Sequence, residues 1–106
     1  MSDTTTNERV ITSVEELKSL VGQELGVSDW LEITQERVNT FADATDDHQW
    51  IHTDAERAAA GPFGTTIAHG YLTLSLIIPL FTRLLEINGI SMSINYGLDR
   101  VRFPQP

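Results

Sequence analysis

Every histidine of this protein lies in one stretch of the chain, residues 46–76, together with a pair of aspartates. The stretch reads DDHQWIHTDAERAAAGPFGTTIAHGYLTLSL, and its histidines are His48, His52 and His69. Asp47 and His52 are separated by a segment that we expect to be extended or looped, so their side chains can converge on one small volume. A carboxylate and an imidazole around one water form a general acid/base pair, because each can take or give a proton near neutral pH. The spacing therefore predicts proton-transfer chemistry at Asp47 and His52.

A second chemical element is the His69-Gly70 pair, which opens the most apolar segment of the chain. We expect a helix to begin there. The first amides of a helix have no helical acceptor and can stabilise a developing oxyanion, and glycine lets a substrate approach closely. The pair therefore predicts an oxyanion-binding amide at Gly70.

Each of these residues also has a purely structural interpretation. Asp46 and Asp47 could form a solvated turn, His52 and His69 could be held by backbone groups, and Gly70 could serve close helix packing. Spacing alone leaves both interpretations open.

Two other kinds of site are disfavoured. A metal site built from His48, His52, His69 and a carboxylate matches no standard zinc spacing, so we expect no metal. Ser75 lacks the glycine-flanked turn of an activated serine, which argues against acyl-serine chemistry.

The composition limits the class of protein. The chain has 106 residues, of which 41% are hydrophobic and 21% charged, as expected for one globular domain. Its net charge of −8 disfavours nucleic-acid binding. It has no cysteine, and its polar start, MSDTTTNERV, is unlike a signal peptide, so we expect a cytoplasmic protein. The apolar stretch 67–90 contains polar and charged residues and is not expected to span a membrane.

The periodicity predicts an α+β fold. Residues 1–10 are expected to be a frayed lead-in. Helices are expected at 14–21, capped by the Ser13-Glu16 box, at 35–44 after Thr34, at 54–60 after Thr53, and at about 69–88, kinked by Pro79. Strands are expected at 26–33, 91–96 and 101–103. The long helix is apolar almost all round in its first turns, which predicts that a curved sheet wraps it.

Residues 41–76 resemble the MaoC-like (R)-specific enoyl-CoA hydratase and dehydratase family. The matching positions are Asp47, His52, the turn at 61–64, and His69-Gly70, and the ending NYGLDRVRFPQP is similar as well. The commoner family motif has Asn-Pro where this chain has Gln49-Trp50. The resemblance implies a single hot-dog domain over residues 1–106, with a curved antiparallel sheet around the central helix. Family members continue through further strands, so we expect either a C-terminally truncated form or a sheet completed by partner subunits.

The resemblance also implies a function. This is hydration of a trans-2-enoyl-CoA to the (R)-3-hydroxyacyl-CoA, or the reverse dehydration. Asp47 and His52 would activate the water, and the Gly70 amide would polarise the thioester carbonyl. The expected substrate contacts are Gln49, His69, Tyr71 and Leu74.

The resemblance implies no metal or other cofactor, because coenzyme A is part of the substrate. It also implies a homodimer or higher oligomer that acts on an acyl-CoA or acyl-carrier thioester. Two alternatives remain open: a hot-dog thioesterase, and a non-catalytic subunit that binds acyl thioesters or is structural.

Overall fold

The computed structural model describes residues 9–106, and their contacts divide into two compact units. The described part of the first unit is residues 9–30 and 77–101, and the second is residues 31–76 and 102–106. Most of the expected frayed lead-in, residues 1–8, lies outside the described residues. Residues 9 and 10 were expected to be frayed but belong to strand β1, Arg9–Ile11. The single-domain expectation stays a prediction.

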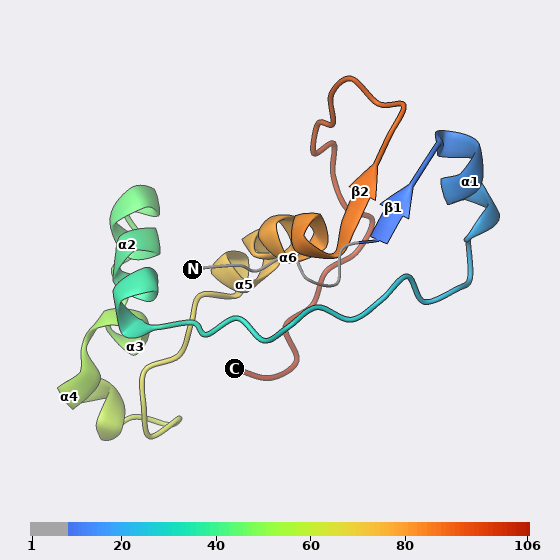
Figure 1. The fold of residues 1–106 in the computed structure, drawn as a ribbon. Coiled ribbons are helices and arrows are strands. Elements are labelled where there is room, and N and C mark those ends of the chain that lie inside the picture. The colour runs from blue at the N-terminus through green and yellow to red at the C-terminus, as the bar shows by residue number, and fades with distance from the viewer. Residues whose placement is uncertain (1–8) are drawn as a thin grey trace. The chain divides into compact units, whose positions relative to one another are not determined.

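The first unit is built on a short pair of parallel strands (Figure 1). β1 pairs with β2, Leu85–Ile87, with Arg9 opposite Leu85 and Ile11 opposite Ile87. Ile11 is fully buried and Leu85 is 4% exposed. The Asn88 amide extends the ladder by donating to the Ile11 carbonyl at 2.8 Å. Burial of these two side chains holds together segments that are far apart in the sequence.

Helix α1, Val14–Ser19, begins at the predicted capping box. The Ser13 hydroxyl accepts from the Glu16 amide at 3.1 Å. The Glu16 carboxylate reaches back one residue further than expected and accepts from the Thr12 amide and hydroxyl, at 2.8 and 2.7 Å. These bonds to the charged form hold the pKa of Glu16 below its usual value.

Helix α2, Gln35–Thr45, carries the second unit and ends next to the acidic pair. Thr34 caps it, as predicted, by accepting from the Arg37 amide at 3.1 Å. Val38 and Ala42 face the core at 4% and 0% exposure. The helix stops at Asp46, which takes the left-handed conformation with φ 59°, a geometry that aspartate tolerates. This reversal sets the direction in which the chain leaves toward Asp47.

The segment after α2 corrects one prediction. Residues 48–52 were expected to be extended or looped, but Trp50–Thr53 form the helical turn α3. Helix α4, Ala55–Ala59, follows, and its cap is Asp54, one residue later than predicted, accepting from the Arg57 amide at 3.0 Å. The capping side chain shifts because Thr53 is itself the last residue of α3.

The central helix is the largest departure from expectation. Two helices, α5 (Gly70–Ser75) and α6 (Ile77–Leu84), occupy the place of the single helix predicted over 69–88. Pro79 has no amide hydrogen, and its ring clashes with the carbonyl four residues earlier, on Ser75, so the interruption falls directly after that residue. The predicted last turn is strand β2, because Leu85 is buried by pairing with β1.

The expected wrapping of this region is also not observed. Tyr71 is 70% exposed and Ile77 49% exposed, and no residue of α6 is buried. Residues 26–33, 91–96 and 101–103 form no strand, and the two strands of the described chain run parallel, not antiparallel. A strand needs a neighbour for its backbone groups, and these segments have none within residues 9–106. The mixture of helix and sheet is confirmed, and the curved antiparallel sheet is not formed here.

Among residues 9–106, no helix has the length and apolarity that crossing a bilayer requires.

The α2 cap provides a test of the second unit. Thr34→Ala removes the acceptor for the Arg37 amide and should lower the free energy of unfolding by about 1 kcal/mol. Urea denaturation followed by circular dichroism measures this. Thr40→Ala is the matched control: its hydroxyl bonds back to the Glu36 carbonyl within the same helix, so its loss should leave stability unchanged or slightly higher. Equal losses in both variants would contradict the capping role.

Candidate active site

Three ionisable side chains of the second unit come together: Asp47, His52 and His69. One carboxylate oxygen and one nitrogen from each ring lie within 4.8 Å of one another. Asp47 is exposed, whereas His52 and His69 are 7% and 2% exposed. Asp47 follows α2, His52 lies in α3, and His69 caps α5. Sequence analysis predicted the approach of Asp47 to His52, and the structure adds His69 to the cluster.

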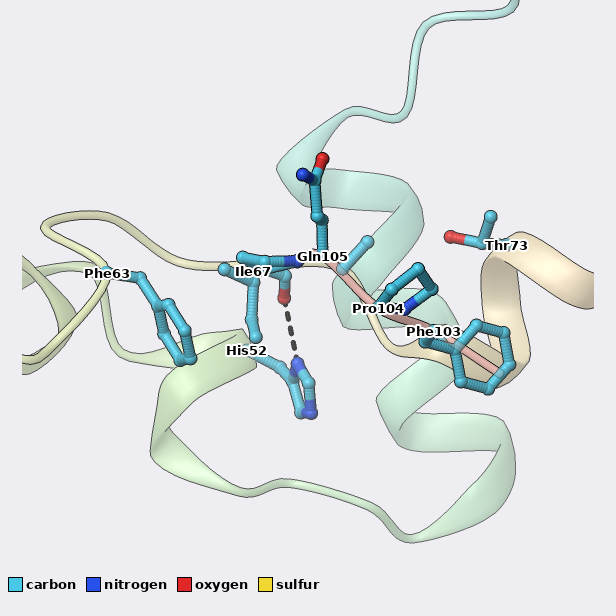
Figure 2. A pocket seen from close by; sticks show the side chains of 10 residues that line it. His52, Phe63, Ile67, Thr73, Phe103, Pro104 and Gln105 are labelled. Carbon is cyan, nitrogen blue, oxygen red and sulfur yellow. Dashed lines mark hydrogen bonds between the residues drawn. The ribbon is translucent and has the colours of Figure 1, made fainter. Parts of the chain in front are cut away.

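The orientation of the His52 ring is set by one hydrogen bond. Its Nδ1 lies 2.8 Å from the Ile67 carbonyl oxygen, drawn as the dashed line in Figure 2. A carbonyl only accepts, so Nδ1 carries the hydrogen and Nε2 of the neutral ring carries the lone pair. The Ile67 amide in turn donates at 3.0 Å to the carbonyl of Ile51, the residue that precedes His52. These two bonds hold the His52 ring and the backbone beside it. The ring therefore presents Nε2 as a proton acceptor.

Gln35 is a residue of this site that sequence analysis missed. Its side-chain amide donates to the His52 carbonyl at 2.8 Å, and its oxygen accepts from the Thr66 hydroxyl at 2.7 Å. One side chain thus ties together the two backbone segments that orient the imidazole. No sequence signal pointed to it, because a glutamine in the first turn of a helix is ordinarily a solvated residue.

His69 contacts both members of the predicted pair. Its Nε2 lies 3.0 Å from the Asp47 main-chain carbonyl, so Nε2 carries the hydrogen. Its ring stacks on that of His52, with centroids 3.8 Å apart and planes at 21°, and lies 4.8 Å from the Phe41 ring. Its other nitrogen, Nδ1, is buried and has no hydrogen-bond partner among the described residues. Such a buried acceptor costs on the order of 1–3 kcal/mol.

The third histidine lies apart from the cluster. His48 bonds through Nε2 to the Asp43 carboxylate at 2.9 Å, and the two side chains are 52% and 77% exposed. A surface pair of this kind contributes little to stability. Asp46 serves as the left-handed cap of α2. Neither residue belongs to the cluster of Asp47, His52 and His69.

A mostly apolar cavity of about 420 Å³ opens beside the His52 ring (Figure 2). In this view Phe63 and Phe103 lie on either side of His52. The lining residues are His52, Phe63, Ile67, Ala68, Gly70, Thr73, Phe103, Pro104, Gln105 and Pro106. The cavity therefore places one imidazole against a space that suits an apolar group.

Gly70 lies against the ring of Phe103. A Cβ built on Gly70 would lie 2.6 Å from Cδ2 of Phe103, so a glycine is needed for this close packing. Phe103 also packs edge-on against Tyr71, with centroids 6.1 Å apart. Gly70 therefore serves close packing, as its structural interpretation held. It also lines the cavity, and the oxyanion role of its amide stays a prediction.

The predicted substrate contacts are placed as follows. Tyr71 is 70% exposed, and neither it nor Leu74, Gln49 or His69 lines the cavity beside His52. Thr73 of α5 and Phe103 line it instead. The substrate-binding assignment of the four residues stays a prediction.

The cluster could be read as a metal site, because two imidazoles and one carboxylate are common ligands. Tetrahedral zinc with bonds of 2.0–2.1 Å brings its ligand atoms to about 3.3 Å from one another, and the atoms here all lie within 4.8 Å of one another. Stacked rings also have in-plane lone pairs in parallel planes, which do not converge on one ion. Two groups that share one water through bonds of 2.8 Å lie about 4.6 Å apart. The separation of these atoms is compatible with one shared water, and the expectation of no metal stays a prediction.

The comparisons with known proteins define the class. Residues 16–106 match the family model described as the MaoC like domain, and the chain belongs to this family. Membership confirms the resemblance found in the sequence and implies the hot-dog fold.

The chain is also similar to several named proteins. The 3-hydroxyacyl-thioester dehydratase Z of Mycobacterium tuberculosis is 58% identical over 98 residues, which cover 92% of this chain and 65% of that protein. Nodulation protein N of Rhizobium meliloti is 54% identical over 96 residues, covering 89% of this chain and 60% of that protein. A 3-hydroxybutyryl-CoA dehydratase of Methylorubrum extorquens is 38% identical over 78 residues, covering 69% of this chain and 50% of that protein. The chain thus spans between half and just under two thirds of the length of these three relatives.

The contact between Gly70 and Phe103 can be tested by a double-mutant cycle. Gly70→Ala alone should lower the free energy of unfolding by about 1–3 kcal/mol, because the new methyl group overlaps the Phe103 ring. In a Phe103→Ala background the same change should be neutral or stabilising, since alanine is the better helix former. Urea denaturation of the four proteins gives the coupling energy. Equal effects of Gly70→Ala in both backgrounds would show that the two residues do not touch.

Proposed function

We propose that this chain catalyses the reversible addition of water to a trans-2-enoyl thioester, giving the (R)-3-hydroxyacyl thioester. The observation that carries the proposal is the convergence of Asp47 with a His52 ring whose Nε2 lone pair is available. The dehydratase names of two relatives support a hydro-lyase acting on hydroxyacyl thioesters.

The water would be held between the Asp47 carboxylate and His52 Nε2. His52 takes one proton from the water while the water oxygen bonds to C3 of the substrate. The electron pair of the double bond moves toward C2 and the thioester carbonyl, forming an enolate-like intermediate. A proton returned from the acid/base pair to C2 completes the addition, so the product gains one hydrogen and one hydroxyl. Dehydration follows the same steps in reverse.

The negative charge that develops on the thioester oxygen needs a donor. Gly70 is the first residue of α5 and lines the same cavity as His52, and its amide is our candidate. Donors positioned in this way typically contribute a hundredfold or more to the rate. The acyl chain would lie in the cavity against Phe63, Ile67 and Phe103, where apolar side chains remove it from water.

The substrate would be carried by coenzyme A or an acyl carrier protein, and no separate cofactor takes part in these steps. We further propose that the active form is a homodimer or higher oligomer, which light scattering measures.

Two substitutions test the acid/base pair. Asp47→Asn and His52→Gln keep the approximate shapes of the side chains but remove their proton chemistry. Each should lower kcat/KM for hydration of crotonyl-CoA by about 10²–10⁴-fold. The assay follows the loss of enoyl-thioester absorbance. Asp43→Asn is the matched control, because Asp43 is an exposed aspartate bonded to His48, away from the cluster, and it should leave the rate unchanged.

The outcomes separate the candidate activities. Loss of hydration in both variants with a normal control supports the pair. Release of free thiol without hydration would indicate a thioesterase, and binding without either reaction would indicate a non-catalytic subunit. Full activity in Asp47→Asn and His52→Gln would refute the assignment of the chemistry to these residues.

Removal of metal ions provides an independent check. Dialysis against EDTA should leave the hydration rate unchanged, because the proposed steps use a water held by Asp47 and His52 and no metal ion. Enzyme assayed with and without subsequent addition of zinc measures this. Loss of activity on dialysis, restored by zinc, would contradict the water-based arrangement.

A further inference from the structure

His69 is the most deeply buried member of the cluster, and its position does not suit a direct substrate contact. Its side chain is 2% exposed, and it does not line the cavity beside His52. A residue that is closed off in this way acts on the substrate only through its neighbours. Its two neighbours are the residues of the proposed acid/base pair.

The first neighbour is the main chain of Asp47. The Nε2–H of His69 donates to the Asp47 carbonyl at 3.0 Å. Asp47 itself follows the left-handed turn at Asp46, and its amide is bonded to the Ala42 carbonyl at 3.1 Å. The backbone on both sides of the Asp47 side chain is therefore held, and His69 supplies the second of these two constraints.

The second neighbour is the His52 ring. The two imidazoles stack with centroids 3.8 Å apart at an interplanar angle of 21°. The Ile67 carbonyl holds the edge of the His52 ring at Nδ1, and the His69 ring covers one of its faces. Together these contacts leave the ring little freedom to tilt away from the position where Nε2 is presented.

The Nδ1 of His69 is buried and has no hydrogen-bond partner among residues 9–106. A buried acceptor without a hydrogen-bond partner in the described chain is a cost that an apolar ring would avoid. A phenylalanine would keep a flat ring against His52 and lose only the bond to a carbonyl of Asp47, an exposed residue that water can reach. The imidazole is required only if the bond to Asp47 matters.

We propose, on the basis of the hydration activity proposed above, that His69 is a positioning residue that couples Asp47 to His52. Its Nε2–H holds the carboxylate-bearing residue, and its ring face holds the imidazole, so that the two bind one water at the same time. A misplacement of about 1 Å in such a pair typically costs on the order of a hundredfold in rate.

Two substitutions separate the two contacts. His69→Phe keeps the ring face and removes the donor to Asp47. His69→Gln keeps an N–H donor at about the position of Nε2 and removes the ring. Ala58→Gly is the matched control, because Ala58 is a buried helical residue of the same unit. It should lower stability without touching the cluster.

Three quantities are measured for each protein: kcat and KM for crotonyl-CoA hydration, the Kd of the saturated analogue butyryl-CoA, and the urea midpoint of unfolding. Both His69 variants should show a fall in kcat of about tenfold to a hundredfold with the Kd unchanged within twofold. The urea midpoint of His69→Phe should not fall, whereas that of Ala58→Gly should fall with no change in kcat.

Several outcomes would overturn the inference. An unchanged kcat in both variants would show that His69 positions neither residue. A Kd that rises in step with the loss of kcat would make His69 a substrate contact. A loss of activity that tracks the urea midpoint across all variants, including Ala58→Gly, would make its role purely structural.

A further measurement does not depend on turnover. Histidine-selective ¹⁵N NMR of the parent should report the Nδ1–H tautomer of His52, and His69→Gln should shift or broaden those ring signals because the stacking partner is gone. Unchanged His52 signals would refute the coupling even in a protein that is inactive. A parent without hydration activity but with the expected NMR response would refute only the proposed function.

Discussion

The hydrogen bond from His52 Nδ1 to the Ile67 carbonyl is the contact on which the site depends. It fixes the tautomer of the imidazole and so determines which nitrogen can take a proton. It also joins α3 to the segment that leads into α5, and the reciprocal bond from the Ile67 amide to the Ile51 carbonyl makes this joint a two-point attachment. The segment held in this way carries His69 and Gly70 to the same place.

The surrounding contacts support that joint from several directions. Gln35 bonds to the segments on both of its sides, at the His52 carbonyl and at the Thr66 hydroxyl. On α3, the Trp50 ring lies under the Arg57 guanidinium at 4.4 Å, and a Cβ on Gly61 would meet that ring at 3.0 Å. These contacts link α2, α3, α4 and the 61–64 turn into one support for a single imidazole. Such pre-arrangement is what the proposed proton transfer needs, because little reorganisation then remains for the reaction step.

Local signals in the sequence were reliable where local physics decides the structure. The caps at Ser13 and Thr34 form as predicted, because each depends on a hydroxyl and an amide three residues apart. Pro79 interrupts the central helix because its own ring and missing hydrogen act within one turn. The predicted strands at 26–33 and 91–96 did not form in the described chain, because a strand depends on a partner that its own sequence does not specify. The sequence did not predict the helical turn at Trp50–Thr53, because four residues are too few to show a helical periodicity.

The sequence by itself determined the chemical inventory and the family. Asp47, His52 and the His69-Gly70 pair were singled out because acid/base chemistry requires these residue types, and the match to the MaoC like domain includes all of them. Only the tertiary structure decided how these residues are arranged around one another. Burial and stacking of His69, the bond that selects the His52 tautomer, and the support from Gln35 all join residues 15 to 31 positions apart. Contacts over such separations are set by how the helices pack, and no local pattern of residues encodes them.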